Sequence, residues 1–97
     1  MANPEHLDFL KQGVEVWNWW RLANQQIEPD LSETDLSNVE LSGAVLINTN
    51  LAGASLYHKN LFNMHLSDSN LQRAKLDFCD LRRARLKRAD LTEASLI

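Results

Sequence analysis

Leucine recurs at every fifth position of the sequence, without a break, from residue 31 onward. In an α-helix, at about 100° per residue, successive members of such a series would lie about 140° apart and would encircle the helix. In a flat strand, the odd spacing would send alternate leucines to opposite faces of the sheet. The spacing instead predicts a coil in which each group of five residues forms one side, turns a corner and directs its leucine inward again. We expect this core ladder to consist of Leu31, Leu36, Leu41, Leu46, Leu51, Leu56, Leu61, Leu66, Leu71, Leu76, Leu81, Leu86, Leu91 and Leu96.

Small side chains occupy most positions two residues before these leucines, as at Ala44, Ala74 and Ala89. This pattern predicts a second inward position beside each leucine. Stacked units of this kind bury a continuous core and form a solenoid. Lys59 and Met64 are exceptions at the small inward position. They indicate either a local bulge with a lysine that reaches out to a corner, or a ligand-dependent site at that corner.

Residues 30–97 resemble the pentapeptide-repeat family, whose unit is Ala-(Asp/Asn)-Leu-X-X. The stretch Ala89-Asp90-Leu91-Thr92-Glu93 matches that unit at every position. The resemblance implies an all-β solenoid, a right-handed quadrilateral β-helix with four repeats per coil and about 3.5 coils in this chain. Residues twenty apart would then stack directly. We therefore expect three stacked pairs on the surface: Asp68 with Arg88, Arg73 with Glu93, and Phe62 with Arg82.

The corner residue, two positions after each leucine, changes in type along the chain. Early corners carry residues that tolerate a positive φ, such as Gly53, whereas later corners carry residues that tolerate it less well, such as Arg83. This difference predicts a change of turn type near residue 70. The same backbone conformation at Gly53 and Arg83 would contradict it.

The N-terminal segment has the pattern of an amphipathic helix. Asn3 followed by Pro4 is a favourable helix start. We expect one helix from Pro4 to Leu22 or Ala23, with residues 1–29 forming a capping helix and connector and residues 30–97 the repeat. The residues predicted to cap the first coil recur at helical spacing: Leu7, Leu10, Val14, Trp17 and Trp20.

Trp19 lies beside Trp17 and Trp20, and all three tryptophans of the chain are therefore in this helix. We expect the cluster to cover the leucines of the first coil. A surface that binds a partner or stacks on a ligand is the alternative. The helix followed by Pro-Asp-Leu-Ser is similar to the leader of cyanobacterial pentapeptide-repeat proteins.

At the other end, the predicted coil has no covering segment, and Leu91, Leu96 and Ile97 are candidate residues for self-association. Exposed leucines and unpaired strand edges favour pairing with another chain. Either two molecules meet tail to tail as a homodimer, or the polypeptide is the first piece of a longer repeat protein.

Charge is unevenly distributed, although the formal net charge is only -3. A basic patch lies in the C-terminal half: Arg82, Arg83, Arg85, Lys87 and Arg88. It indicates either a solvated face or an anion or nucleic-acid contact. The single cysteine, Cys79, and the absence of a signal-like or membrane-spanning apolar segment predict a cytoplasmic protein without a membrane partner.

No group of residues has the spacing of a catalytic or metal site. The three glycines are scattered, and His58, His65 and Cys79 lack metal-ligand spacing. We expect no enzyme activity, no cofactor and no metal, and therefore a non-enzymatic scaffold that binds an unknown protein. The family resemblance adds one alternative, a DNA mimic that inhibits a type II topoisomerase. The basic patch adds another, a weak nucleic-acid binder.

Overall fold

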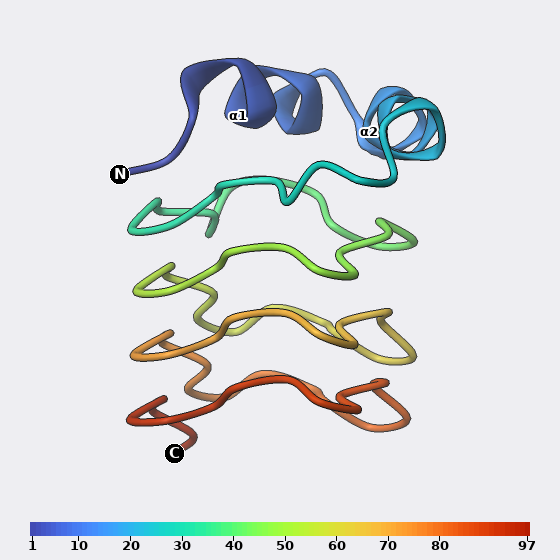
Figure 1. Cartoon of the computed structure of the whole chain (residues 1–97). Coiled ribbons are helices and arrows are strands. Elements are labelled where there is room, and N and C mark those ends of the chain that lie inside the picture. The colour runs from blue at the N-terminus through green and yellow to red at the C-terminus, as the bar shows by residue number, and fades with distance from the viewer.

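The computed structural model describes all 97 residues, Met1–Ile97. Two short helices, α1 (Pro4–Lys11) and α2 (Val14–Ala23), lie at one end of a stack of turns, with the C-terminus at the opposite end (Figure 1). Each turn takes twenty residues, so residues 30–49, 50–69 and 70–89 form three turns, and residues 90–97 begin a fourth. The helices therefore cover the first turn, and the last residues form the far face.

Adjacent turns are joined by isolated parallel bridges between residues twenty apart, and no extended strand is present. The backbone hydrogen bonds follow a regular rule. The N–H of Leu51 donates to the carbonyl of Asn70 in the next turn (2.7 Å), and the N–H of Asn70 donates back to the carbonyl of Thr49 (2.9 Å). The expected all-β class thus appears only as single-residue bridges, because most residues of each group of five form the corner rather than an extended segment.

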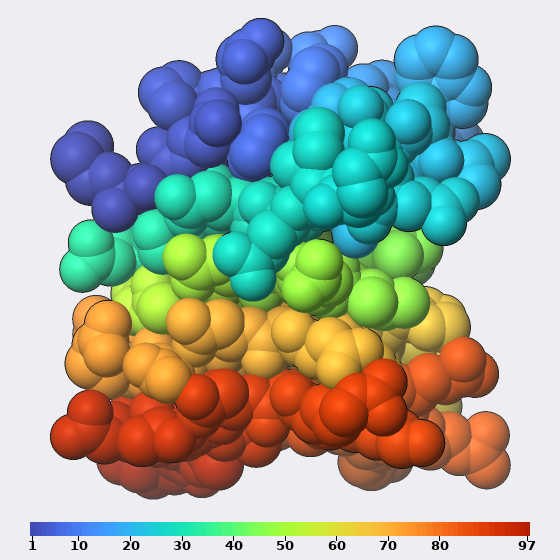
Figure 2. All heavy atoms as spheres, viewed as in Figure 1, coloured from blue at the N-terminus to red at the C-terminus, as the bar shows by residue number.

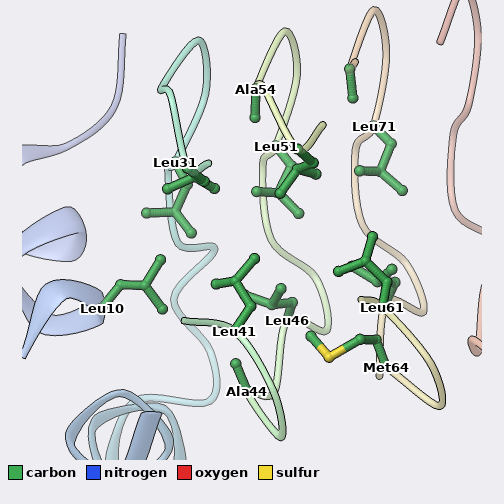
Figure 3. Packing of buried hydrophobic residues seen from close by; sticks show 14 of the residues in the cluster. Leu10, Leu31, Leu41, Ala44, Leu46, Leu51, Ala54, Leu61, Met64 and Leu71 are labelled. Atoms are coloured by element: carbon green, nitrogen blue, oxygen red, sulfur yellow. The ribbon is translucent and has the colours of Figure 1, made fainter. Parts of the chain in front are cut away.

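The leucine ladder lies inside the stack (Figure 3). Its members from Leu31 to Leu76 are each no more than 2% exposed. Leu10 from α1 extends this core across the end of the first turn. Exposure then rises along the chain to 54% at Leu96, because no further turn lies beneath the last residues.

The predicted change of turn type near residue 70 is wrong. Gly53 has a φ of +68° and Arg83 a φ of +61°. The two corners also close in the same way, with the N–H of Ala54 donating to the Leu51 carbonyl and that of Ala84 to the Leu81 carbonyl, each at 3.0 Å. A left-handed conformation costs a non-glycine residue about 1–2 kcal/mol. The stack imposes it regardless, because each corner must keep both its hydrogen bonds and its leucine in register.

The irregular corner lies instead in the first turn. Asn38 is the one corner residue between residues 33 and 93 without a positive φ. Lys59, one turn further on, donates a hydrogen bond from its Nζ to the carbonyl of Val39. In a regular turn that carbonyl would accept the N–H of Asn60, and the bridge expected between Glu40 and Asn60 is missing. Met64, the other exception, is buried in the core (Figure 3).

The prediction of one continuous helix is wrong as well. Asn3 caps α1, as its sequence predicts, by accepting hydrogen bonds from the backbone N–H groups of Glu5 (2.9 Å) and His6 (3.4 Å). The helix ends at Lys11, and Gly13 adopts a φ of +118° before α2 begins. A straight helix over the predicted range would measure about 28 Å, longer than the 25 and 21 Å minor dimensions of the molecule. The break lets both helices lie across the end of the stack.

Candidate interaction surfaces

Polar side chains of α2 satisfy the open backbone edge of the first turn. The N–H of Val45 donates to Asn18 Oδ1 (2.8 Å), and Trp17 Nε1 donates to the Val45 carbonyl (2.8 Å). Arg21 Nη2 donates to the Ile47 carbonyl (3.1 Å). In the later turns, the preceding turn supplies the partners of the equivalent backbone groups. These three side chains therefore supply the hydrogen-bond partners that a preceding turn supplies elsewhere in the stack.

Residues at the start of α1 bond a second part of this backbone edge, at Asp30. The N–H of Asp30 donates to His6 Nδ1 (3.0 Å), and its carbonyl accepts the N–H of Asn3 (2.9 Å). Asn18, Arg21 and His6 were not among the predicted capping residues. The capping residues were predicted from apolar character, which these three side chains lack. The one available signal was that Asn18 and Arg21 lie close to Trp17 on the same helix.

The predicted capping residues pack against the core to different degrees. Leu10 and Trp17 are buried, and three others are partly buried against the same cluster: Leu7, Val14 and Trp20. Trp19 is 74% exposed, so the expectation that all three tryptophans cover the first turn is wrong. Residues two apart on a helix point about 200° apart, so Trp17 faces the core and Trp19 faces solvent.

The last turn has no such cover. The N–H groups of Leu61, Leu66 and Leu71 each donate to a carbonyl in the next turn, at 2.8–2.9 Å. The equivalent groups of Leu81, Leu86 and Leu91 have no backbone acceptor. This edge belongs to the red residues, which form the end of the molecule opposite the helices (Figure 2). Leu96 and Ile97, predicted for self-association, are both exposed there, whereas Leu91 is partly buried.

The basic patch is partly neutralised within the molecule. Arg88 forms two hydrogen bonds with Asp68 (2.6 and 3.1 Å), and Arg82 pairs with Asp80 (2.9 Å). These bonds hold the pKa of each carboxyl below its ordinary value and raise the pKa of each guanidinium. The ring of Phe62 lies 5.7 Å from the Arg82 guanidinium, as the stacking predicts.

The remaining basic side chains make fewer contacts. Arg85 Nη1 lies 3.4 Å from His65 Nδ1, and Arg83 and Lys87 form no ion pair. The predicted pairing of Arg73 with Glu93 is also absent, with no ion pair within 4.0 Å. Side chains that stack at an exposed corner retain the freedom to point apart, so the register alone does not produce a contact. Three separate cations on the surface make a weak electrostatic footprint for a nucleic acid.

The acidic or amide residue before alternate leucines forms a local hydrogen bond with the corner that follows it. Asn50, Asn70 and Asp90 each accept a hydrogen bond from the backbone N–H two residues later, at 2.9–3.1 Å. Such local bonds fix the start of a corner. Hydrogen bonds from Gln72 and Thr92 lower the pKa of Asp90 to about 2.

The inward column at Lys59 places a lysine above a cysteine. Cys79 donates from Sγ to the Leu56 carbonyl (2.7 Å), and burial raises the pKa of its thiol. A surface cavity of about 400 Å³ lies beside Lys59. No three side chains of His, Cys, Asp or Glu lie where they could hold a metal ion. The contact between Lys59 and the Val39 carbonyl accounts for this irregular corner without a ligand.

Neither helix has the length and apolar character needed to cross a membrane.

Comparisons with known proteins agree with the geometry of the turns. No curated protein matches the chain. The family model for pentapeptide repeats matches eight copies, over residues 30–68 and 65–97. Members of this family are generally non-enzymatic structural proteins that form right-handed quadrilateral β-helices. With most of its length covered by these repeats and its leucines stacked one turn above the next, the chain belongs to the pentapeptide-repeat family.

Proposed function

We propose that this protein is a non-enzymatic interaction scaffold, built as a right-handed quadrilateral β-helix, which associates with a second copy of itself through its last turn. One observation carries the proposal: the two ends of the stack differ. At the helical end, side chains of α1 and α2 bond the backbone edge of the first turn. At the other end, the N–H groups of Leu81, Leu86 and Leu91 have no backbone acceptor.

An edge of this kind favours association for two physical reasons. Unpaired N–H and carbonyl groups are a template for a further bridge, and apolar side chains beside them gain from burial. Leu96 and Ile97 supply exposed apolar surface at this end. A second copy presents the same groups, so a tail-to-tail dimer covers both edges at once.

Self-association can be tested by sedimentation equilibrium across a range of protein concentrations. We expect the mass of the wild-type protein to rise from monomer to dimer as the concentration increases. The double variant Leu96→Lys/Ile97→Lys places two cations on each side of the contact and should remain monomeric. Trp19→Lys is the matched control, because it adds a charge at an exposed apolar side chain on the helical end. A wild-type protein that stays monomeric at millimolar concentration contradicts the proposal.

The alternative functions have less support. A nucleic-acid contact would depend on the basic patch, in which Arg82 and Arg88 already bind carboxylates of the same chain. A DNA mimic requires a long acidic stripe, whereas all cations of this short stack except Lys59 lie in its third turn, residues 70–89. We also propose a cytoplasmic location, which the free thiol of Cys79 supports.

A further inference from the structure

The guanidinium of Arg21 is a buried charge without a counter-ion. The residue is only 6% exposed, and no carboxylate lies within 4.0 Å of it. Its hydrogen bonds go to three backbone carbonyls: Nη1 donates to Asn24 (3.1 Å) and Ile27 (2.8 Å), and Nη2 donates to Ile47 (3.1 Å). Burial lowers the pKa of the guanidinium. These bonds join α2 to the segment that follows it and to the first turn, but they leave the positive charge of Arg21 without a counter-ion.

The guanidinium also has donors to spare. Arginine carries five N–H groups, and three of them are used in the contacts with carbonyls. The Nε of Arg21 is buried and has no hydrogen-bond partner. The remaining donors are therefore the Nε–H and one N–H of Nη2. Nε and Nη2 lie on the same edge of the guanidinium, and such an edge can bind a carboxylate with two parallel hydrogen bonds.

Arg21 lines a cavity of about 420 Å³ between α2 and the first turn. Figure 1 shows α2 at the end of the stack, next to the first turn. Leu22, Val45 and Ile47 provide its apolar wall. Its other lining residues are uncharged and carry amides: Asn18, Gln25 and Asn48. The cavity therefore combines an apolar surface with one fixed positive charge, within the size range of small-molecule sites.

We propose that this cavity binds a small monocarboxylate with an apolar body, whose carboxylate accepts hydrogen bonds from Nε and Nη2 of Arg21. The apolar body then packs against Leu22, Val45 and Ile47. A phosphate fits the cavity less well, because it carries more negative charge than one guanidinium offsets and has no apolar body to pack against Leu22, Val45 and Ile47. The Asn18 amide donates one N–H to the Gly43 carbonyl and accepts the Val45 N–H, so its orientation is fixed by the first turn.

Entry of the ligand requires a small movement, since Nε is covered in the structure. Leu22 and Gln25 are the exposed side chains of the cavity, and the one contact to be given up is the 3.3 Å hydrogen bond from Gln25 Nε2 to the Leu22 carbonyl. Arg21 itself is held by its three carbonyl contacts. The charge is thus already in place before the ligand arrives, and binding does not have to order it.

The site can be tested by NMR titration of the intact protein with hexanoate, and with 1-hexanol as the uncharged probe of the same length. We expect hexanoate to bind with a Kd of about 1 mM or tighter and at least tenfold more tightly than 1-hexanol. It should shift the Arg21 Nε–H resonance downfield, which reports the contact directly. Both measurements use the wild-type protein and do not depend on the folding of a variant.

Asn48→Asp supplies a competing carboxylate inside the cavity. Asn48 has a φ of +55°, a conformation that aspartate also tolerates. Asn63→Asp is the matched control, since Asn63 has a φ of +61° at an exposed corner outside the cavity. We expect Asn48→Asp to weaken hexanoate binding at least tenfold and Asn63→Asp to leave it unchanged. Smaller discrimination against 1-hexanol, an unmoved Nε–H resonance, or equal effects of the two variants would each overturn the proposal.

Discussion

Trp17 Nε1 donates a hydrogen bond of 2.8 Å to the carbonyl oxygen of Val45, and this bond joins α2 to the first turn of the stack. The indole is fully buried, so its ring covers the leucine core while its N–H bonds a backbone acceptor. Tryptophan suits this position because its ring is large and apolar while its N–H can still bond. The helical cap is therefore held by a directed contact as well as by burial.

Replacing Trp17 by phenylalanine should lower the free energy of unfolding by about 1–3 kcal/mol, because it leaves the Val45 carbonyl without this donor. Urea denaturation followed by circular dichroism measures the change. Trp19→Phe is the control, since Trp19 is exposed and should change stability by no more than about 0.5 kcal/mol. Equal effects of the two substitutions would show that the hydrogen bond contributes nothing.

Arg83 should carry backbone strain that a different residue relieves. Its φ is +61°, and asparagine adopts this conformation more readily than arginine does. We expect Arg83→Asn to raise the free energy of unfolding by about 0.5–1 kcal/mol and Arg83→Val to lower it by about 1 kcal/mol or more. The same two substitutions at Lys87, an exposed residue without a positive φ, serve as controls and should not separate in this way.

Acid should destabilise the protein progressively below its neutral range. Several carboxyls have a pKa below the ordinary value in the folded state, and that of Asp90 lies at about 2 because Gln72 and Thr92 donate to it. A lowered folded-state pKa stabilises the fold above the unfolded pKa, and this contribution is lost as the pH falls through the folded value. Stability should therefore decline from about pH 4 toward pH 2.

Asp90→Asn isolates one contribution to this decline, because the amide keeps an acceptor for the Thr92 N–H and does not titrate. We expect a shallower dependence of stability on pH between about 4 and 2 in this variant. Urea unfolding at a series of pH values provides the measurement. A profile parallel to that of the wild type would mean that Asp90 does not contribute.

Lys59 should weaken the contact between the first two turns. Its Nζ bonds the Val39 carbonyl, and neither the Asn60 N–H nor the Leu41 N–H bonds across the turns at this corner. In Lys59→Ala, the carbonyl becomes free to accept the Asn60 N–H, as the equivalent carbonyls do in regular turns. Hydrogen exchange should then slow at Asn60 and Leu41.

Lys75→Ala is the matched control for this experiment, since Lys75 is an exposed lysine in a regular bridge with Ser55. Exchange at Asn60 and Leu41 should not change in the control. Unaltered exchange in Lys59→Ala would show that the corner is irregular for another reason, such as the backbone conformation at Asn38.

The interior could be predicted from the sequence because it repeats a local rule. A leucine at each fifth position must reach the same axis whichever turn it occupies, so the spacing alone indicated the direction of every side chain in the ladder. The pairing of Asp68 with Arg88 and the contact of Phe62 with Arg82 followed from the turn of twenty residues that the family resemblance implied. Arg73 and Glu93 share that register and still do not meet, because exposed side chains choose among several rotamers.

The corners and the ends could not be predicted in this way. Arg83 takes the same φ as a glycine corner because the turn beside it dictates the backbone, against the preference of the residue itself. The helix breaks at Gly13 because two helices must fit across one turn, a limit that local helix propensity does not contain.

By itself, then, the sequence determined the five-residue unit of the stack and the residues of its core, since both depend on a pattern repeated along the chain. Tertiary structure alone decided how the stack ends. Asn18 and Arg21 became caps because folding brings α2 against Val45 and Ile47, more than twenty residues away, and only that approach shows which backbone groups still need a partner.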